Sequence, residues 1–263
     1  MPSDGRPMRR ALSSLNTASD LTLRLISLGF FLLVWAIAAY FAHSSRLPGP
    51  WSVANSMVDH IAAGDLPYHI GITLARVAAA FVIAMAIGTA IGLAMGRSRG
   101  TDILFDGWLI LGLNVPALVV IVLCYIWLGL TDVAAIIAVA LNKIPLVVVN
   151  VREGARTLDR DLQQVAEIYR FSWGKRFLKV TLPQLTPYIM AAARNGLAII
   201  WKIVLVVELL GRSNGVGFQL SIYFQYFDIS SILAYTLAFI AVVLFIELAL
   251  LHPLEVRLTR WRL

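Results

Sequence analysis

Three ionisable residues that could act on a solute lie within long apolar runs. Lys143, Lys202 and Glu208 are each followed by an aliphatic residue. A charge at the centre of a bilayer costs about 2.5–3.5 kcal/mol on insertion scales, so such residues mark ion pathways, solute contacts or buried pairs. Either the lysines attract an anionic solute that offsets their desolvation, or they pair with Glu208 or with backbone carbonyls. The sequence leaves both interpretations open.

Other kinds of chemistry find little support. The histidines at 43, 60, 69 and 252 lack the spacing of metal ligands, so no metal site is expected. The glycine-rich run at 211–217 is not followed by Lys-Ser or Lys-Thr, which excludes a P-loop. Cys124 is the single cysteine and lies in an apolar run. We therefore expect no catalytic residues and no cofactor bound by this chain.

The composition is that of a membrane protein. Apolar residues make up 59% of the 263 residues and the mean hydropathy is +0.80, whereas soluble domains have roughly 45–50% apolar residues. The net charge of +7 gathers beside apolar runs, which favours anionic lipid over nucleic acid as its partner. We expect a polar tail at 1–20 and a single membrane domain at 21–263.

The apolar runs predict an all-α integral membrane protein with six transmembrane helices: 21–42, 69–95, 103–130, 133–149, 183–210 and 232–251. This topology places sixteen of the 22 Lys and Arg residues in segments on one side and two on the other. By the positive-inside rule, the richer side is the cytoplasm. Both termini and the polar stretch 150–188 are then cytoplasmic.

Two patterns within the spans suggest functional positions. Small residues recur every four positions in the second span, which allows another helix to approach closely, as a moving contact or as ordinary packing: Ala80, Ala84, Gly88, Gly92 and Gly96. The two middle spans each carry an Asn followed by a Pro, and such groups need partners that lipid cannot supply. We expect the bundle interior, and any translocation path through it, to include Asn114, Pro116, Asn142, Lys143, Pro145, Trp201, Lys202 and Glu208.

The stretch from Asn150 to Tyr188 is the long polar interval of the chain. Leu158, Leu162 and Val165 recur at helical spacing, and Ser172 can cap a second short helix. Two short amphipathic helices between membrane spans would form a docking surface for a soluble partner.

This stretch resembles the EAA loop of binding-protein-dependent ABC transporter permeases. Counting back from Leu182-Pro183, the Glu-Ala-Ala positions hold Gln164-Val165-Ala166, and the family's glycine position holds Arg170. A similar run at 153–158 lies too far from Pro183 to be the motif. The Leu-Pro-x-Pro run at 47–50 and the glycine-rich turn at 211–218 also resemble the family, most closely its nitrate, sulfonate and taurine importer branch.

The resemblance implies the transmembrane subunit of a type I importer in a bacterial inner membrane, and not an enzyme. The coupling loop, about 152–182, would dock on a cytoplasmic ATPase dimer that holds ATP and Mg. A second permease copy would complete the path, and an extracytoplasmic binding protein would deliver a small solute, such as a sulfonate, nitrate or another anion. The implied coupling residues are Gln164, Val165, Ala166, Glu167, Arg170, Ser172, Trp173 and Gly174.

Two other classes remain as alternatives. Lys143, Lys202 and Glu208 could serve as the proton or ion relay of a secondary transporter or channel. The chain could also be a membrane scaffold that transports nothing. A basic two-helix cytoplasmic loop favours the ABC permease, because a secondary transporter has no need of one.

Overall fold

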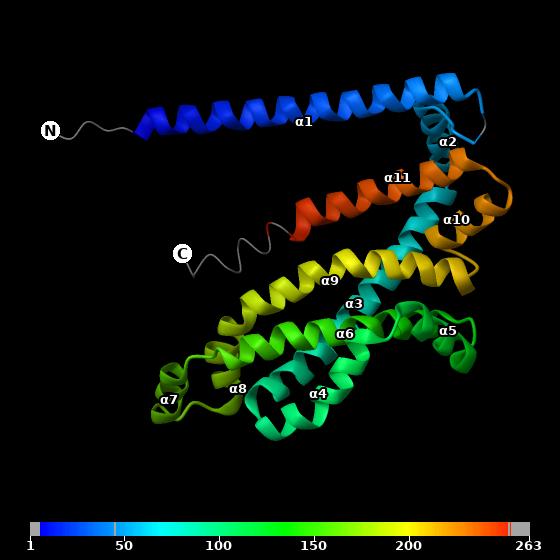
Figure 1. Ribbon diagram of the computed structural model, residues 1–263. Helices are drawn as coiled ribbons and strands as arrows, with labels where there is room; N and C mark the ends of the chain where they lie inside the picture. Colours follow the sequence, from blue (N-terminus) through cyan, green and yellow to red (C-terminus); the bar gives the residue numbers. More distant parts are fainter. Residues whose placement is uncertain (1–5, 45, 252, 254–263) are drawn as a thin grey trace.

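The computed structural model describes residues 6–44, 46–251 and 253, and every regular element within them is helical (Figure 1). Two of these elements are short π-helical turns, η1 and η2. In chain order the elements are α1 (Arg6–Ala42), α2 (Pro50–Ala62), α3 (Asp65–Arg97), α4 (Arg99–Asn114), α5 (Ala117–Leu128), α6 (Asp132–Arg156), α7 (Arg160–Ile168), α8 (Trp173–Arg176), η1 (Phe177–Thr181), α9 (Leu182–Gly211), α10 (Val216–Gln225), α11 (Ile229–Ile246) and η2 (Glu247–Leu251).

Four helical segments in the described part of the chain are long and apolar enough to cross a membrane: Asp65–Arg97, Asp132–Arg156, Trp173–Gly211 and Ile229–Ala249. The α4–α5 pair adds a fifth if it is taken as one span, although it bends by 99°. In α1 the described apolar part, Ile26–Ala42, is shorter than a full span. The structure therefore shows an all-helical protein with four to five candidate spans.

The span expected over 103–130 is not one continuous helix, and Pro116 is the reason. The helix α4 ends at Asn114, and Val115 takes an extended conformation with φ −69° and ψ 124°. A residue before proline is driven out of the helical region because the proline ring clashes with its backbone. The chain restarts as α5 in a different direction.

Pro145 behaves differently, since it lies inside α6 without ending that helix. Its ring is buried against Gly112 of α4, where an added Cβ would lie 2.8 Å from the Pro145 Cγ. The helix α6 continues to Arg156, past the expected end of the fourth span at 149. Its last turns therefore belong to the segment expected to be a loop.

The centre of the bundle is formed by α3, α6 and α9, with α3 and α6 sharing the most extensive contact. The small residues of α3 make this contact: Ala80 and Ala84 are 0% exposed, and a Cβ at Gly88 would lie 2.6 Å from the Cβ of Val147. At Gly92 an added Cβ would lie 2.8 Å from the carbonyl oxygen of Val148, and Gly96 packs on Ala155. The ladder thus packs two helices of the same chain together.

Figure 1 shows how the ends of the bundle differ. The short helices α7 and α8 lie at one end, beyond the ends of α6 and α9, while α5 and α10 lie at the opposite end. The helix α1 lies along one side of the bundle, and α2 links it to the remaining helices. Its apolar side chains are largely exposed, Phe30 at 67% for example, as expected of a helix that faces lipid or another chain.

Candidate functional site

The helix α7 is a well-capped structural unit. The carboxylate of Asp159 accepts hydrogen bonds from the backbone N–H groups of Asp161 (2.8 Å) and Leu162 (3.3 Å). The helix ends at Ile168, and two hydrogen bonds follow its last turn. Phe171 N–H donates to the Ala166 carbonyl and Arg170 N–H donates to the Glu167 carbonyl, both at 2.9 Å. This pair of bonds is a Schellman motif, which satisfies the last carbonyls of a helix.

Arg170 occupies the position at which the family motif has glycine, and its backbone has φ +50°. That left-handed conformation costs an L-residue roughly 1–2 kcal/mol, which explains why glycine is favoured there. The turn geometry is therefore present here although the glycine is not. The sequence pattern showed the departure and could not show that the turn survives it.

A second short helix follows, as the spacing around Ser172 predicts. Ser172 precedes α8 and its carbonyl accepts a hydrogen bond from Arg176 N–H at 2.9 Å, but its side chain makes no capping bond. Arg176 joins α8 to α7 by donating to the Gln163 Oε1 at 2.7 Å and pairing with Glu167 at 2.8 Å. The region from α7 to η1, the coupling segment (160–181), is thus a folded unit.

The two faces of α7 differ. Ala166 is only 1% exposed, so its side chain faces the protein and not the solvent. Val165, Ile168 and Tyr169 are 46%, 77% and 73% exposed, and Gln164 and Glu167 are also exposed. Of the implied coupling residues Gln164, Val165 and Ala166, the first two are therefore free to meet a partner, whereas Ala166 faces inward and supports the turn.

Hydrogen bonds tie the coupling segment and its flanking residues to the long helices. Asp159 N–H donates to the Gln184 Oε1 at 2.8 Å, and Thr157 Oγ1 donates to the Tyr188 hydroxyl at 3.0 Å. The Arg97 guanidinium at the end of α3 donates to the Thr181 Oγ1 at 2.7 Å. A displacement of α7 would therefore act on α3, α6 and α9 together.

The opposite end of the bundle contains a buried ion cluster centred on Glu208, which is 0% exposed. One carboxylate oxygen accepts from the Arg76 guanidinium at 2.6 Å, and the other accepts from Thr73 Oγ1 and Gly217 N–H, both at 2.9 Å. Arg76 also pairs with Asp132 at 2.6 Å. Pairing of Lys143 or Lys202 with Glu208 is thus wrong, and Arg76 is the partner.

The glycine-rich turn after α9 closes over this cluster. Gly215 N–H donates to the His69 Nδ1, and Val216 N–H donates to the Thr73 Oγ1, both at 2.9 Å. Gly215 has φ +106°, and an added Cβ there would collide with the Glu208 carboxylate. His69 and Thr73 are functional parts of this cluster that sequence reasoning missed, because their partners lie more than 130 residues away.

The charge of Lys143 is buried without a hydrogen-bond or ion-pair partner among the described residues. Its side chain is 1% exposed, and its Nζ has no hydrogen-bond partner among the described residues. It lies against Gly196 of α9, where an added Cβ would collide with its Cε. Only a glycine at this position leaves room for the lysine between α6 and α9.

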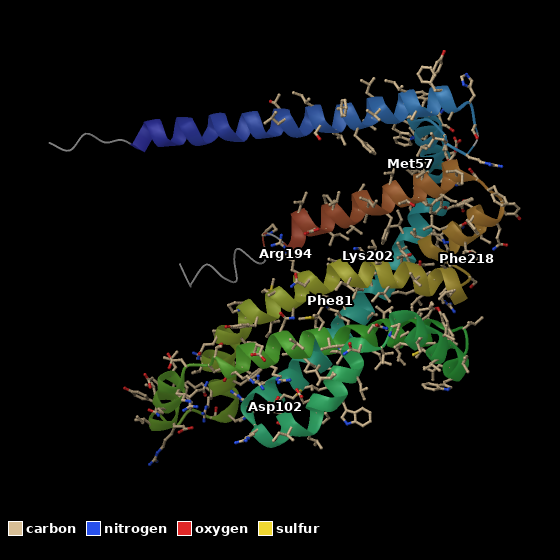
Figure 2. The ribbon with its side chains drawn as sticks, viewed as in Figure 1. Met57, Phe81, Asp102, Arg194, Lys202 and Phe218 are labelled. Atoms are coloured by element: carbon tan, nitrogen blue, oxygen red, sulfur yellow. The ribbon has the colours of Figure 1, made fainter. Side chains whose placement is uncertain are left out.

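Lys202 and Trp201 belong to a different environment. A cavity of about 380 Å³ between α9, α10 and α11 is lined mainly by apolar side chains, with Arg194, Lys202 and Glu247 as its charged members. Trp201 packs edge-to-face on Phe239, with ring centroids 6.0 Å apart. Figure 2 shows Arg194 and Lys202 on α9, on the side that faces α11.

The expected path residues do not all converge. Asn114 and Pro116 are exposed at the α4–α5 bend, and the side-chain amides of Asn114 and Asn142 donate to the carbonyls of Ile110 and Ala138 in their own helices. Glu208 is fully enclosed in its ion cluster, so it lines no path in this conformation. No relay joining Lys143, Lys202 and Glu208 forms among the described residues.

These features define a class: a helical membrane protein whose core helices lead into a folded, outward-facing two-helix segment. A family model described as "Binding-protein-dependent transport system inner membrane component" matches residues 84–252, and the chain belongs to that family. It is therefore a permease subunit of an ABC importer, a multi-pass inner-membrane protein, and not the subunit that hydrolyses ATP.

Known proteins support this assignment. The chain is 32% identical over 216 residues to the putative aliphatic sulfonates transport permease protein SsuC of Bacillus subtilis (strain 168), covering 82% of this chain and 78% of that one. It is 24% identical over 203 residues to the nitrate import permease protein NrtB of Synechococcus elongatus (strain ATCC 33912 / PCC 7942 / FACHB-805), covering 73% of each chain.

The fold also matches a solved structure. A chain of the inward-facing MetNI methionine ABC transporter superposes with a TM-score of 0.60 at 17% identity, covering 72% of this chain and 94% of that one. At this level of identity the likeness concerns the fold alone.

Proposed function

We propose that this permease works as a homodimer, with six spans in each copy, in an ATP-driven importer of small organic or inorganic anions. An ATPase dimer that holds ATP and Mg would bind its cytoplasmic side, and a binding protein would deliver the anion outside. Family membership supports the ATPase and the binding protein as partners. The uncompensated burial of Lys143 is the observation that favours an anion.

The six-span topology counts α1 and the bent α4–α5 pair as spans beside the four long segments. It leaves both termini and the coupling segment in the cytoplasm, in keeping with the positive-inside count. In this arrangement the Glu208 cluster and the turn above it lie at the outer side.

The coupling surface is the outward face of α7, formed by Val165, Ile168 and Tyr169 with Gln164 and Glu167 between them. These apolar side chains are exposed at a helix end, where a partner groove would cover them. The capped segment beneath them is joined by hydrogen bonds to the long helices, and it transmits the motion of an ATPase to α3, α6 and α9. The coupling roles of Arg170, Ser172, Trp173 and Gly174 are then to shape the turn and the second helix.

A matched pair of variants tests this surface. Ile168→Asp places a charge on the outward face of α7 and should abolish co-purification of the ATPase and solute-stimulated ATP hydrolysis. Leu178→Asp makes the same change at a 61% exposed residue of η1, outside α7, and should leave both intact. Equal coupling in the two variants would place the docking surface elsewhere.

The preference for an anion rests on Lys143 and Lys202. A lysine held in an apolar interior is stabilised by an anion that approaches it, and Lys202 faces the cavity beside α11. In a homodimer the exposed Lys202 residues contribute two cations beside one central path, with Trp201 adjacent, and the two enclosed Lys143 residues add their charge from within the bundle. That field attracts anions and repels cationic solutes.

Transport in reconstituted vesicles tests the preference. With the binding protein, ATPase and permease present, uptake of sulfonates and of nitrate should be measured beside uptake of a cationic or neutral solute. Lys202→Met should lower anion uptake while leaving membrane abundance and ATPase docking unchanged. Uptake of a neutral solute by the wild type, unaffected by Lys202→Met, would reject the anion and leave the permease assignment standing.

A further inference from the structure

A second cavity lies between the end of α3, the end of α6 and the coupling segment, and its volume is about 650 Å³. We refer to it as the Arg97 cavity. Four of its lining residues are arginines and none is acidic: Arg97, Arg156, Arg160 and Arg176. Such a concentration of guanidinium groups requires a source of negative charge nearby.

Carboxylates just outside the lining neutralise two of these arginines. Arg156 pairs with Asp102 at 2.6 Å and with Glu153 at 3.0 Å, and Arg176 pairs with Glu167 at 2.8 Å. The other two arginines, Arg97 and Arg160, form no ion pair with a carboxylate of any described residue.

Arg97 is bonded to the neutral hydroxyl of Thr181, and its charge repels that of Arg176. Arg160 makes no hydrogen bond or ion pair with any described residue. The cavity therefore carries two solvent-exposed guanidinium groups that no carboxylate of the described residues neutralises.

Gln163 gives an independent indication of what the cavity binds. Its Oε1 accepts from the Arg176 Nε, which fixes the orientation of the amide, because the opposite orientation would set two donors against each other. Its Nε2 is thereby left buried, with no acceptor among the described residues. A buried donor without an acceptor is unfavourable, and a bound oxyanion would supply the missing acceptor.

The partner ATPase does not reach this cavity in the proposed arrangement. Gln163 and Ala166 lie three residues apart on the inward side of α7, whereas Val165, Ile168 and Tyr169 face outward. A protein docked on the outward face is separated from the cavity by the width of the helix. The occupant is therefore small or enters from the side.

We propose that the Arg97 cavity binds a phosphate-type oxyanion, held by Arg97, Arg160 and the Gln163 amide. Guanidinium groups bind phosphate through paired N–H donors, and basic pockets at the cytoplasmic ends of membrane helices bind lipid head groups. Trp173, 79% exposed and stacked on Phe177, lies at the rim, where an interfacial tryptophan meets head groups. The phosphate belongs either to an anionic lipid or to a free ion in the cytoplasm.

This site is distinct from the proposed solute path. It sits where the coupling segment joins α3 and α6, so its occupancy would hold the segment against the bundle. An anion bound there sets how readily the ATPase moves these helices, whatever solute the importer carries.

The experiment uses the assembled permease and ATPase, purified in detergent and depleted of lipid. Binding of radiolabelled inorganic phosphate is measured directly, and retention of phosphatidylglycerol is measured by native mass spectrometry after incubation in mixed phosphatidylglycerol–phosphatidylcholine nanodiscs. The double variant Arg97→Gln/Arg160→Gln should weaken binding by roughly tenfold for each guanidinium lost. The control Arg99→Gln/Lys179→Gln makes the same change in charge at two exposed residues that do not line the cavity and should bind as the wild type does.

Gln163→Glu provides a second variant if the double variant does not fold. It keeps the acceptor for Arg176, removes the free donor and puts a negative charge at the cavity wall. It should abolish phosphate binding, whereas Gln225→Glu, the same change at an exposed residue of α10 far from the cavity, should not.

The two sources are separated by competition. If phosphate binds the lipid-depleted complex and phosphatidylglycerol does not displace it, the ligand is the free ion. If phosphatidylglycerol is retained through Arg97 and Arg160 and blocks phosphate, the ligand is a lipid head group. The proposal is overturned if neither ligand distinguishes the cavity variants from their controls, or if phosphate binds the permease and is lost when the ATPase is attached.

Discussion

Glu208 and Lys143 are both enclosed within the helical bundle, yet their surroundings are opposite. Glu208 is 0% exposed and is bonded by Arg76 and Thr73 of α3 and by Gly217 of α10. Lys143 is 1% exposed and its Nζ has no partner among the described residues. One buried charge is fully satisfied inside the chain, and the other has no partner among the residues that the structure describes.

The difference separates a structural charge from a functional one. A buried ion pair contributes little net stability but is costly to break, because the remaining partner is left as an uncompensated charge without solvent. The Glu208 cluster therefore fixes the turn at 211–217 against α3. An unpaired buried lysine stabilises nothing in the fold by its charge, so its presence in the membrane interior points to a role with a ligand or a second copy of the chain.

The largest effect is expected from Arg76→Met. It leaves Glu208 buried without its cation, which should lower the free energy of unfolding by about 3–5 kcal/mol. The permease should lose most of its abundance in the membrane and its thermal stability in detergent, as measured by quantitative immunoblotting and by scanning fluorimetry.

The double variant Arg76→Met/Glu208→Gln provides the control for this effect. It removes both charges and should recover part of the stability. Arg99→Gln, an exposed arginine outside the cluster, should have no effect. Additive losses in the double variant would show that the two side chains are not coupled.

Most of the fold class could be predicted from the sequence, because hydrophobic runs and the positive-inside pattern depend only on local composition. The bend at Pro116 and the continuous helix at Pro145 could not be told apart, since both prolines follow an Asn in an apolar run. What separates them is packing: Pro145 has Gly112 of another helix to pack against. Such tertiary contacts leave no local signal.

The candidate sites show the same division. The two short helices after α6 and the motif position at Arg170 follow from spacing, and the structure gives Arg170 the left-handed φ expected of the family's glycine. The pairing of Arg76 with Glu208 joins residues 132 positions apart in the chain. Which face of α7 turns inward depends on how α7 packs against η1 and Arg176. Sequence spacing carries no information about them.

Gly196→Ala should have the second-largest effect and tests how tightly Lys143 is held. The new methyl group would collide with the Cε and Nζ of Lys143, so either the lysine or α9 must shift. Overpacking of this kind costs roughly 1–3 kcal/mol. The thermal shift measures the loss, and Lys143→Ala in the same chain should relieve it. If Gly196→Ala is as stable as the wild type, Lys143 has freedom to move, and its burial is not a constraint.

The smallest effect on stability is expected from Lys143→Met, and its sign is informative. Methionine keeps a similar length and volume and removes the polar head, so no buried group is left without a partner. The free energy of unfolding should stay the same or rise by about 1 kcal/mol, the cost of an unsatisfied buried amine. Anion uptake in vesicles should nevertheless fall, because the cation that favours the solute is gone. Stability and transport would then move in opposite directions, which no structural role of Lys143 produces. The opposite result would be a marked loss of thermal stability in the assembled transporter, with uptake lost in proportion. Lys143 would then have a partner in the dimer, and its contrast with Glu208 would hold only for the single chain.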